Sequence, residues 1–274
     1  MPHTELVDLA TSIATQAADM VARRRREGVA VADRKTSSVD VVTHADRESE
    51  QLIRSLLAEA RPDDGFFGEE SGASVGSSGL TWVVDPIDGT VNYLYGIPHY
   101  AVSVAVVEGE PDPATWRALA GAVVNPGARE TYTASVGGGS FLDGERLQVA
   151  GAVDLSEALV ATGFSYLEEM RVEQGQVIAG LLSQVRDIRR MGTASLDLCM
   201  VASGRVNAYF ERSLNPWDHA AGALIAREAG ATVKGRGNNA AGKEFILAAE
   251  PSVAVLLGAA LARLDAWVDH LKVG

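Results

Sequence analysis

The stretch Trp82-Val-Val-Asp-Pro-Ile-Asp-Gly-Thr90 decides how this chain folds around its acidic residues. Its apolar start predicts a β-strand that ends at Asp85, where the following proline fixes φ and turns the chain. Gly89 permits backbone conformations that other residues resist. The turn can therefore place the carboxylates of Asp85 and Asp88 beside the carbonyl of Ile87. Two carboxylates and a carbonyl make a hard-oxygen site suited to Mg²⁺.

The residues after this turn, and other acidic segments, bear on the same site. After Gly89 the chain can begin a helix whose free N–H groups point back to the turn, and such groups bind phosphate. Asp-Pro and Asp-Gly pairs are common turn formers, so the stretch alone would more often be a plain turn. Further carboxylates come from Gly68-Glu-Glu-Ser71, Asp40, Asp46 and Asp218. Asp218, near a predicted helix start, would in isolation be a helix cap.

Composition is typical of a globular protein. The chain has 274 residues, of which 47% are hydrophobic and 22% charged, enough for one large domain or two small ones. Its net charge of −12 argues against non-specific nucleic-acid binding and requires a local source of positive charge if the substrate is anionic. Cys199 is the only cysteine, which favours a reducing, cytoplasmic setting. The sequence contains no run of about 18 apolar residues, so no membrane helix is expected.

Periodicity predicts a mixed α and β protein. Residues 1–150 are expected to form an antiparallel-rich half and residues 151–274 an alternating half, packed as one catalytic unit. Helices are expected over residues 4–26, 43–60, 168–184, 194–202, 217–229 and 252–271. Strands are expected over residues 80–85, 100–107, 118–124, 129–135, 158–162, 206–210, 231–234 and 245–249. Loops are expected over residues 29–42 and 71–79.

Four consecutive arginines, Arg23 to Arg26, end the first predicted helix. One interpretation is a solvated last turn, favoured by the helix dipole. The other is a patch for nucleic acid or another anion. The acidic net charge weakens the second interpretation.

Together, these segments resemble the inositol monophosphatase family of magnesium-dependent, lithium-sensitive phosphatases. The stretch from Asp85 to Asn92 is similar to the first family signature, and Trp217-Asp-His-Ala-Ala-Gly222 is similar to the second. Further family blocks are matched, in order, by residues 35–46, 68–71 and 192–194. The resemblance extends from about residue 5 to 265. It implies the layered αβαβα sandwich of the sugar phosphatases, an α+β or α/β fold, and a homodimer.

The resemblance also implies a role for individual residues. Thr90 and Asp46, beside Glu69, would orient the attacking water and help to deprotonate it. Two or three Mg²⁺ ions would be held at each site. The implied ligands are Glu69, Asp85, the carbonyl of Ile87, Asp88, Asp218 and, mostly through water, Glu70. The implied substrate-binding residues are Lys35, Asp88, Gly89, Thr90, Gly192, Thr193, Ala194, Glu211 and Asp218.

The expected activity is Mg²⁺-dependent hydrolysis of myo-inositol 1-phosphate to myo-inositol and phosphate. Bound cations would turn a pocket that repels anions into one that attracts them, and would lower the pKa of water. Glu211, as an acceptor for hydroxyl groups, and Val91-Asn-Tyr93 favour inositol phosphate as the substrate. The alternative substrates within the family are histidinol phosphate, 3′-phosphoadenosine 5′-phosphate and sugar bisphosphates. The resemblance also leaves open a regulatory family member that binds RNA polymerase or RNA, for which the arginine run is the only support in the sequence.

Overall fold

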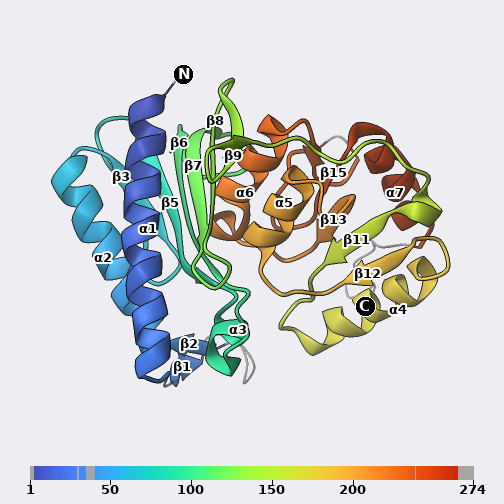
Figure 1. The fold of residues 1–274 in the computed structure, drawn as a ribbon, viewed down its shortest axis with the longest axis horizontal. Coiled ribbons are helices and arrows are strands. Elements are labelled where there is room, and N and C mark those ends of the chain that lie inside the picture. Colours follow the sequence, from blue (N-terminus) through green and yellow to red (C-terminus); the bar gives the residue numbers. More distant parts are fainter. Residues whose placement is uncertain (1–2, 30, 35–40, 238, 265–274) are drawn as a thin grey trace, which may run out of the picture.

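Five layers of secondary structure follow one another across the molecule (Figure 1). Helices α1 (Thr4–Glu27) and α2 (His44–Ala60) cover one face of an eight-stranded sheet. Helices α5 (Ala194–Ala202) and α6 (Pro216–Glu228) lie between this sheet and a five-stranded sheet. The computed structural model describes residues 3–29, 31–34, 41–237 and 239–264.

The far face of the five-stranded sheet is covered by α4 (Glu168–Leu181) and α7 (Pro251–Arg263). The αβαβα order predicted from the family resemblance is therefore confirmed. Each sheet belongs to one of the two predicted halves, but α5 and α6 of the second half pack against the sheet of the first. Among the described residues, no helix is both long and apolar enough to cross a membrane.

The eight-stranded sheet is antiparallel except where its first and third strands along the chain pair in parallel. In chain order its strands are β3 (Gly65–Gly68), β4 (Gly72–Ser74), β5 (Leu80–Asp88), β6 (Ala101–Glu108), β7 (Arg117–Asn125), β8 (Glu130–Ser135), β9 (Gly139–Leu142) and β10 (Glu145–Arg146). In space the order is β10-β9-β8-β7-β6-β5-β3-β4, so β5 lies inside the sheet.

The five-stranded sheet is mixed. Its strands are β11 (Leu159–Thr162), β12 (Asp187–Arg189), β13 (Ala208–Glu211), β14 (Thr232–Lys234) and β15 (Ile246–Ala249), in the spatial order β12-β11-β13-β15-β14. The first three strands in that order run parallel, and β15 and β14 run antiparallel to their neighbours. The remaining elements are β1 (Val31–Arg34), β2 (Val41–Thr43), α3 (Thr90–Tyr95) and the 3₁₀ turn η1 (Leu155–Glu157).

Four buried hydrophobic clusters fill the four boundaries between layers. The strand β5 shows how one element serves two of them. Trp82 and Val84 pack in the cluster with α1 and α2, whereas Val83 packs in the cluster with α5 and α6. Side chains of a strand alternate between faces, so both faces of β5 are buried and its sequence is continuously apolar.

Several sequence predictions were wrong in detail. Residues 29–42 contain the antiparallel pair β1 and β2, and residues 71–79 contain β4, where a loop was predicted in each case. Both stretches are short and rich in polar or small residues, and their strands depend on a neighbouring strand rather than on an apolar pattern. The last helix, predicted over 252–271, is α7 as far as Arg263, and residues 265–271 lie outside the described residues.

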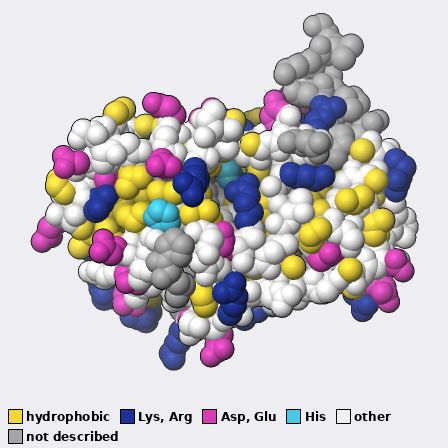
Figure 2. Space-filling model, turned by 90° about the horizontal axis from the view of Figure 1, so that it is seen from above, with side chains coloured by type: hydrophobic (Ala, Val, Ile, Leu, Met, Phe, Trp, Pro, Cys, Tyr) yellow, Lys and Arg dark blue, Asp and Glu magenta, His cyan; other side chains and the backbone are white. Residues whose placement is uncertain are grey.

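Acidic and basic side chains are interspersed on the face shown in Figure 2. Opposite charges also pair within and beside the arginine run at the end of α1. Arg24 forms ion pairs with Glu27 at 2.8 Å and with Glu48 of α2 at 2.7 Å. These pairs are exposed, so each contributes little to stability. They favour the interpretation of the run as a solvated last turn.

Candidate active site

The acidic site begins with an irregularity in β5. The strand continues through Asp88, although the sequence predicted that it would end at Asp85. Asp85 pairs with Ser103 of β6 and Asp88 pairs with Ala101, so three steps along β5 match two along β6. This extra residue is a β-bulge, at a proline that has no N–H to donate. Residues three apart in a regular strand face opposite ways, so the bulge lets both carboxylates face α5 and α6.

The partners of these two carboxylates come from distant segments. Asp218 lies in the first turn of α6, where its Oδ2 accepts the N–H of Asn215 at 2.6 Å. Asp218 therefore caps α6, as predicted, and also lies near Asp88. Glu69 follows β3, and its N–H donates to the carbonyl of Val84 at 3.3 Å. Parallel pairing of β3 with β5 thus brings Glu69 beside Asp85.

The four carboxylates, which we call the acidic cluster (Glu69, Asp85, Asp88 and Asp218), perturb one another. Burial raises the pKa of Asp85 well above its ordinary value, and repulsion by the other three and a hydrogen bond with the Glu69 carboxyl add to the shift. The pKa of Asp218 is raised by burial and then by repulsion from Glu69 and Asp88. Burial raises the pKa of Asp88 only to about 6, because hydrogen bonds with the side chain and N–H of Ser195, and with the N–H of Ala194, favour its charged form.

The donor set of the acidic cluster suits a hard divalent cation. Carboxylate oxygens are the preferred ligands of such ions. Within the described ranges, no lysine or arginine forms an ion pair with Asp85, Asp88 or Asp218. In the same ranges, no three Asp, Glu, His or Cys side chains are arranged so that they could already hold an ion. Like charges repel, so a cation is the partner that would draw these oxygens together.

Thr90 and Asp46, predicted to act together on water, are in contact. The Thr90 hydroxyl lies 3.0 Å from both Asp46 Oδ1 and the carbonyl oxygen of Ile87. Asp46 is held in turn by Thr43, whose hydroxyl and N–H donate to Oδ2 at 2.5 and 2.8 Å. Burial raises the pKa of Asp46 to about 7, although the hydrogen bonds from Thr43 oppose the shift. A carboxyl with a pKa near neutrality is well matched to proton transfer.

The segment predicted to bind the polyol leads into α5. Gly192 has a positive φ of 84°, and Thr193 is the residue that precedes the helix. The N–H of Ser195, in the first turn, donates to Asp88 Oδ2 at 2.7 Å. A negative charge is favourable at a helix N-terminus. A carboxylate of the first half therefore caps a helix of the second, at the boundary between the two sheets.

Glu211, the last residue of β13, is another predicted polyol-binding residue. The Tyr209 hydroxyl donates to Glu211 Oε2 at 2.7 Å. Burial raises the pKa of Glu211 to about 7, while the Tyr209 hydrogen bond and the positive charge of Arg190 oppose this shift and repulsion from Asp88 adds to it. The interaction with Asp88 indicates that Glu211 and the acidic cluster share one region.

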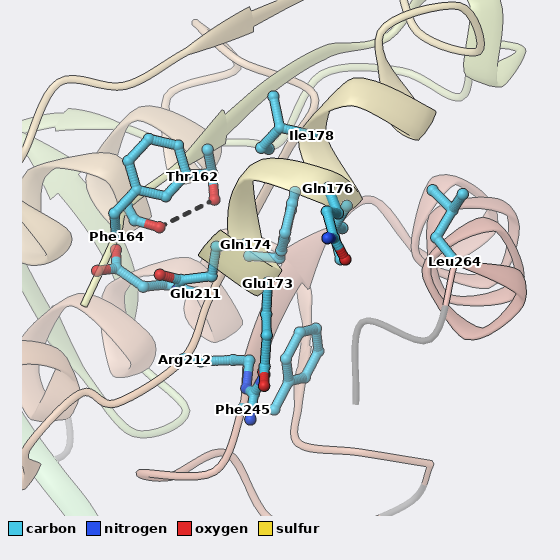
Figure 3. A pocket seen from close by; sticks show the side chains of 13 residues that line it. Thr162, Phe164, Glu173, Gln174, Gln176, Ile178, Glu211, Arg212, Phe245 and Leu264 are labelled. Carbon is cyan, nitrogen blue, oxygen red and sulfur yellow. Dashed lines mark hydrogen bonds and ion pairs between the residues drawn. The ribbon is translucent and has the colours of Figure 1, made fainter. Parts of the chain in front are cut away.

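A small cavity lies beside Glu211, between α4 and the second sheet (Figure 3). Its volume is about 40 Å³, which is room for a few water molecules. Gln174 from α4 and Arg212 from the end of β13 border it, together with Glu211. No residue of the acidic cluster lines this cavity, so it is not the space in which a phosphate would meet those carboxylates.

Three predicted residues need separate mention. The carbonyl of Ile87, predicted to bind metal, accepts the Thr90 hydroxyl. The N–H of Glu70 donates to Glu50 Oε2 at 2.8 Å, which holds the turn that carries Glu69. Lys35, predicted to lie over the site, is outside the described residues.

Sequence reasoning missed the residues of α2 that support this site. Ser49 is buried and donates to the carbonyl of Pro86 at 3.0 Å, within the bulge. Glu50 is buried and accepts from Glu70, as described above. With Asp46 they follow the spacing i, i+3, i+4, which places all three on one helix face. Polar residues at this spacing on the apolar face of a predicted helix were the available signal.

Sequence reasoning also missed a buried acid, Asp197. It is 0% exposed, and neither of its carboxylate oxygens has a hydrogen-bond partner among the residues that the structure describes. Burial raises its pKa well above the ordinary value, and repulsion from Glu211 and Asp88 adds to the shift. The signal was an acid inside the apolar helix pattern from Leu196 to Val201.

Comparison with known proteins finds relatives that match most of the chain. The model of the inositol monophosphatase family matches residues 3–265. Inositol-1-monophosphatase SuhB of Mycobacterium tuberculosis is 43% identical over 279 residues, which cover 95% of this chain and 94% of the relative. The Nus factor SuhB of Xylella fastidiosa is 44% identical over 199 residues, which cover 72% and 70%.

A solved structure has the same fold. The extragenic suppressor protein suhB from Bartonella henselae superposes with a TM-score of 0.86 at 33% identity. The match covers 94% of this chain and 98% of that protein. The similarity therefore includes both sheets and every described helix layer, and it is not confined to one half.

Proposed function

This chain belongs to the inositol monophosphatase family, and from that membership we propose that it hydrolyses myo-inositol 1-phosphate to myo-inositol and phosphate. The enzyme class follows from the family: the protein is a phosphoric monoester hydrolase. The observation that carries the proposal is the acidic cluster next to the hydrogen-bonded pair Thr90 and Asp46. This arrangement combines a site for cations with a site that can accept a proton from water.

The family is metal-dependent, and we propose Mg²⁺ as the metal, with two or three ions at each site. Glu69, Asp85, Asp88 and Asp218, with the carbonyl of Ile87 and mostly through water Glu70, would hold them. When bound, the ions would neutralise charge on the phosphoryl group and promote the ionisation of water. They would also supply the positive charge that an acidic protein needs in order to attract an anionic substrate.

The chain's own residues would position the reactants. Asp46 would accept the proton of the attacking water while the Thr90 hydroxyl orients that water. The backbone at Gly89 and Thr90 would hold the phosphate. Glu211, with Gly192 to Ala194, would bind the hydroxyl groups of the leaving alcohol, so the phosphate and the polyol would be held by different halves of the chain. Lys35 would also contact the substrate.

Four finer properties are part of the proposal. We expect inhibition by lithium, a homodimer, a cytoplasmic location and a preference for inositol phosphate over the other substrates of the family. The preference has the clearest test. Release of phosphate from myo-inositol 1-phosphate, histidinol phosphate, 3′-phosphoadenosine 5′-phosphate and a sugar bisphosphate should be compared with and without Mg²⁺ and Li⁺. Faster turnover of histidinol phosphate would overturn the substrate and leave the phosphatase activity standing.

Glu211 provides a test of the polyol site. In Glu211→Gln we expect KM for myo-inositol 1-phosphate to rise roughly tenfold, because the acceptor loses its negative charge and its hydrogen bonds to the substrate weaken. The pKa of Glu211 is about 7, so its acceptor form gains population as pH rises through 7. The KM of the wild type should therefore fall across that range, while the KM of the variant should not. A parallel pH profile in both proteins would contradict this role.

A regulatory role remains the second hypothesis, because the Xylella fastidiosa relative is named Nus factor SuhB. For this chain the role would be binding to RNA polymerase or RNA. A pull-down with Asp88→Asn tests it, since this substitution should stop hydrolysis and leave the outer surface unchanged. Tight binding of either partner by the inactive variant would support the second role, and no binding would leave hydrolysis as the function.

A further inference from the structure

Asn92 connects the two halves of the candidate active site. It lies in α3, two residues after Thr90, and is buried. Its amide nitrogen donates to the carbonyl oxygens of His99 and Met191, at 2.8 Å each. Met191 directly precedes residues 192–194, the predicted polyol-binding segment. One side chain of the first half therefore holds the backbone of the second.

Thr193 belongs to the same set of contacts. Its hydroxyl donates to the His99 carbonyl at 2.9 Å and lies 3.4 Å from the amide nitrogen of Asn92. Thr193 is 1% exposed and Asn92 is 8% exposed, so this network is shielded from water. Buried polar groups that lose a partner cannot turn to solvent instead, so the network resists deformation.

The network lies directly against the turn that would bind the phosphate. Gly89 has φ of 89°, and a Cβ at this position would collide with the Thr193 hydroxyl and lie 3.2 Å from the His99 carbonyl oxygen. It would also lie 3.4 Å from the carbonyl oxygen of Gly192. No side chain therefore separates the turn from the polyol-binding segment, and their relative position depends on what ties them together.

We infer that Asn92 is a positioning residue, which sets where the leaving alcohol lies relative to the phosphate. The inference rests on the proposed function, because it assigns the phosphate to the Gly89 turn and the alcohol to residues 192–194. Asn92 would act through the backbone of Met191 and the side chain of Thr193, not on the reacting atoms. A displacement of about 1 Å between reacting groups can cost about 100-fold in rate.

Substrates with different leaving groups test this role. For Asn92→Ala we expect kcat/KM for myo-inositol 1-phosphate to fall roughly 10- to 100-fold. For ethyl phosphate, whose leaving group is too small to reach Glu211, we expect a change below about threefold, because uniform binding of the phosphate is retained. Inhibition by inorganic phosphate and the Mg²⁺ concentration for half-maximal activity should stay unchanged. Equal losses for both substrates would overturn the inference.

Asn207→Ala is the matched control. Asn207 is another partly buried asparagine of the second half, and its Oδ1 accepts the N–H of Leu159 at 2.8 Å. Asn207 directly precedes β13, whereas Glu211 ends it. The ratio of kcat/KM for myo-inositol 1-phosphate to kcat/KM for ethyl phosphate should therefore not change. A change of that ratio equal to that of Asn92→Ala would mean that general loosening is the cause, and would overturn the inference.

Thr193 supplies a second test that does not depend on the folding of Asn92→Ala. Thr193→Val keeps the shape of the side chain and removes the hydroxyl, so it should lower the same ratio, whereas Thr193→Ser should retain it. An unchanged ratio in Thr193→Val would overturn the network as the positioning device. A wild type that hydrolyses neither ester would overturn the proposed function instead, so the two failures are distinguishable.

Discussion

At the scale of single residues, the site depends on carboxylates that the fold holds in an unfavourable environment. Burial and mutual repulsion raise the pKa values of Asp85 and Asp218 well above the ordinary range. Buried charges without counter-charges cost free energy unless something neutralises them. A protein keeps such groups where they are used, so the perturbed pKa values agree with a functional site.

Removal of one ligand charge tests this directly. We expect Asp88→Asn and Asp218→Asn each to lower kcat for phosphate release by about 100-fold or more, because each removes a charged ligand near the developing negative charge. Asp19→Asn is the control, since Asp19 is an exposed acid on α1 with the same change of charge. Near-wild-type rates in both site variants would refute the assignment of the ligands.

Asp197 predicts a pH-dependent stability. Its pKa is raised in the folded protein, so the folded state binds more protons than the unfolded state once pH exceeds the ordinary Asp pKa of about 4. Stability should then fall as pH rises from that value toward the raised pKa. Asp197→Asn removes this loss, so its Tm should exceed that of the wild type at pH 8.

The size of this gain can be measured by thermal unfolding across pH. A gain of about 1 kcal/mol corresponds to about 2–4 °C for a chain of this size. The difference in Tm between Asp197→Asn and the wild type should shrink as pH falls through the ordinary Asp pKa of about 4, because Asp197 is protonated in both states below that pH. A constant difference across pH would contradict a raised pKa of Asp197 in the folded protein.

At the scale of elements, the middle helical layer places Asp218 and the start of α5 next to β5. The two helices α5 and α6 approach closely at Gly222, where a Cβ would lie 2.9 Å from Leu198 Cβ and 3.0 Å from the carbonyl oxygen of Ser195. Close packing of this kind leaves little room for relaxation. The position of Asp218 relative to Asp88 therefore depends on the small residues of α6.

A pair of glycine substitutions tests this packing. We expect Gly222→Ala to lower the free energy of unfolding by about 1–3 kcal/mol, because the added methyl overpacks the α5–α6 contact. Gly258→Ala in α7 is the matched change, since a Cβ there meets no atom of the described part of the chain within 4 Å. It should raise stability by roughly 0.5–1 kcal/mol through helix propensity. Urea unfolding measures both, and the same sign for both would contradict the packing argument.

At the scale of the whole molecule, two sheets and five layers bring carboxylates of both halves to one place. Asp85 and Asp88 come from the first half and Asp218 from the second. A cation bound among them would hold the halves together, because it interacts with both. Metal binding and global stability should therefore be linked.

Mg²⁺ should accordingly raise Tm by several degrees at pH 8, since a ligand at 100 times its Kd adds about 2.7 kcal/mol. The effect should be smaller at pH 5.5, because protons compete for carboxylates whose pKa values are raised. NaCl at matched ionic strength is the control for screening, and Asp218→Asn should reduce the Mg²⁺ effect. An equal shift in this variant would place the ion elsewhere.

Local sequence was sufficient for the elements with strong patterns. Helix α1 and helix α2 follow the predicted spacing of apolar residues, and β5 to β7 follow apolar runs bounded by turn signals. The turn residues around Gly89 and the acids of the two signatures were also recognisable, because chemistry of this kind depends on residue type at short spacing.

Tertiary structure alone decided which faces and which partners these residues have. The bulge that turns Asp85 and Asp88 to the same side depends on pairing with β6. The burial of Asp197, and the contact of Asn92 with Met191 99 positions along the chain, depend on how the two halves pack. Sequence patterns carry local conformation, whereas burial, charge repulsion and long-range hydrogen bonds exist only once distant segments meet.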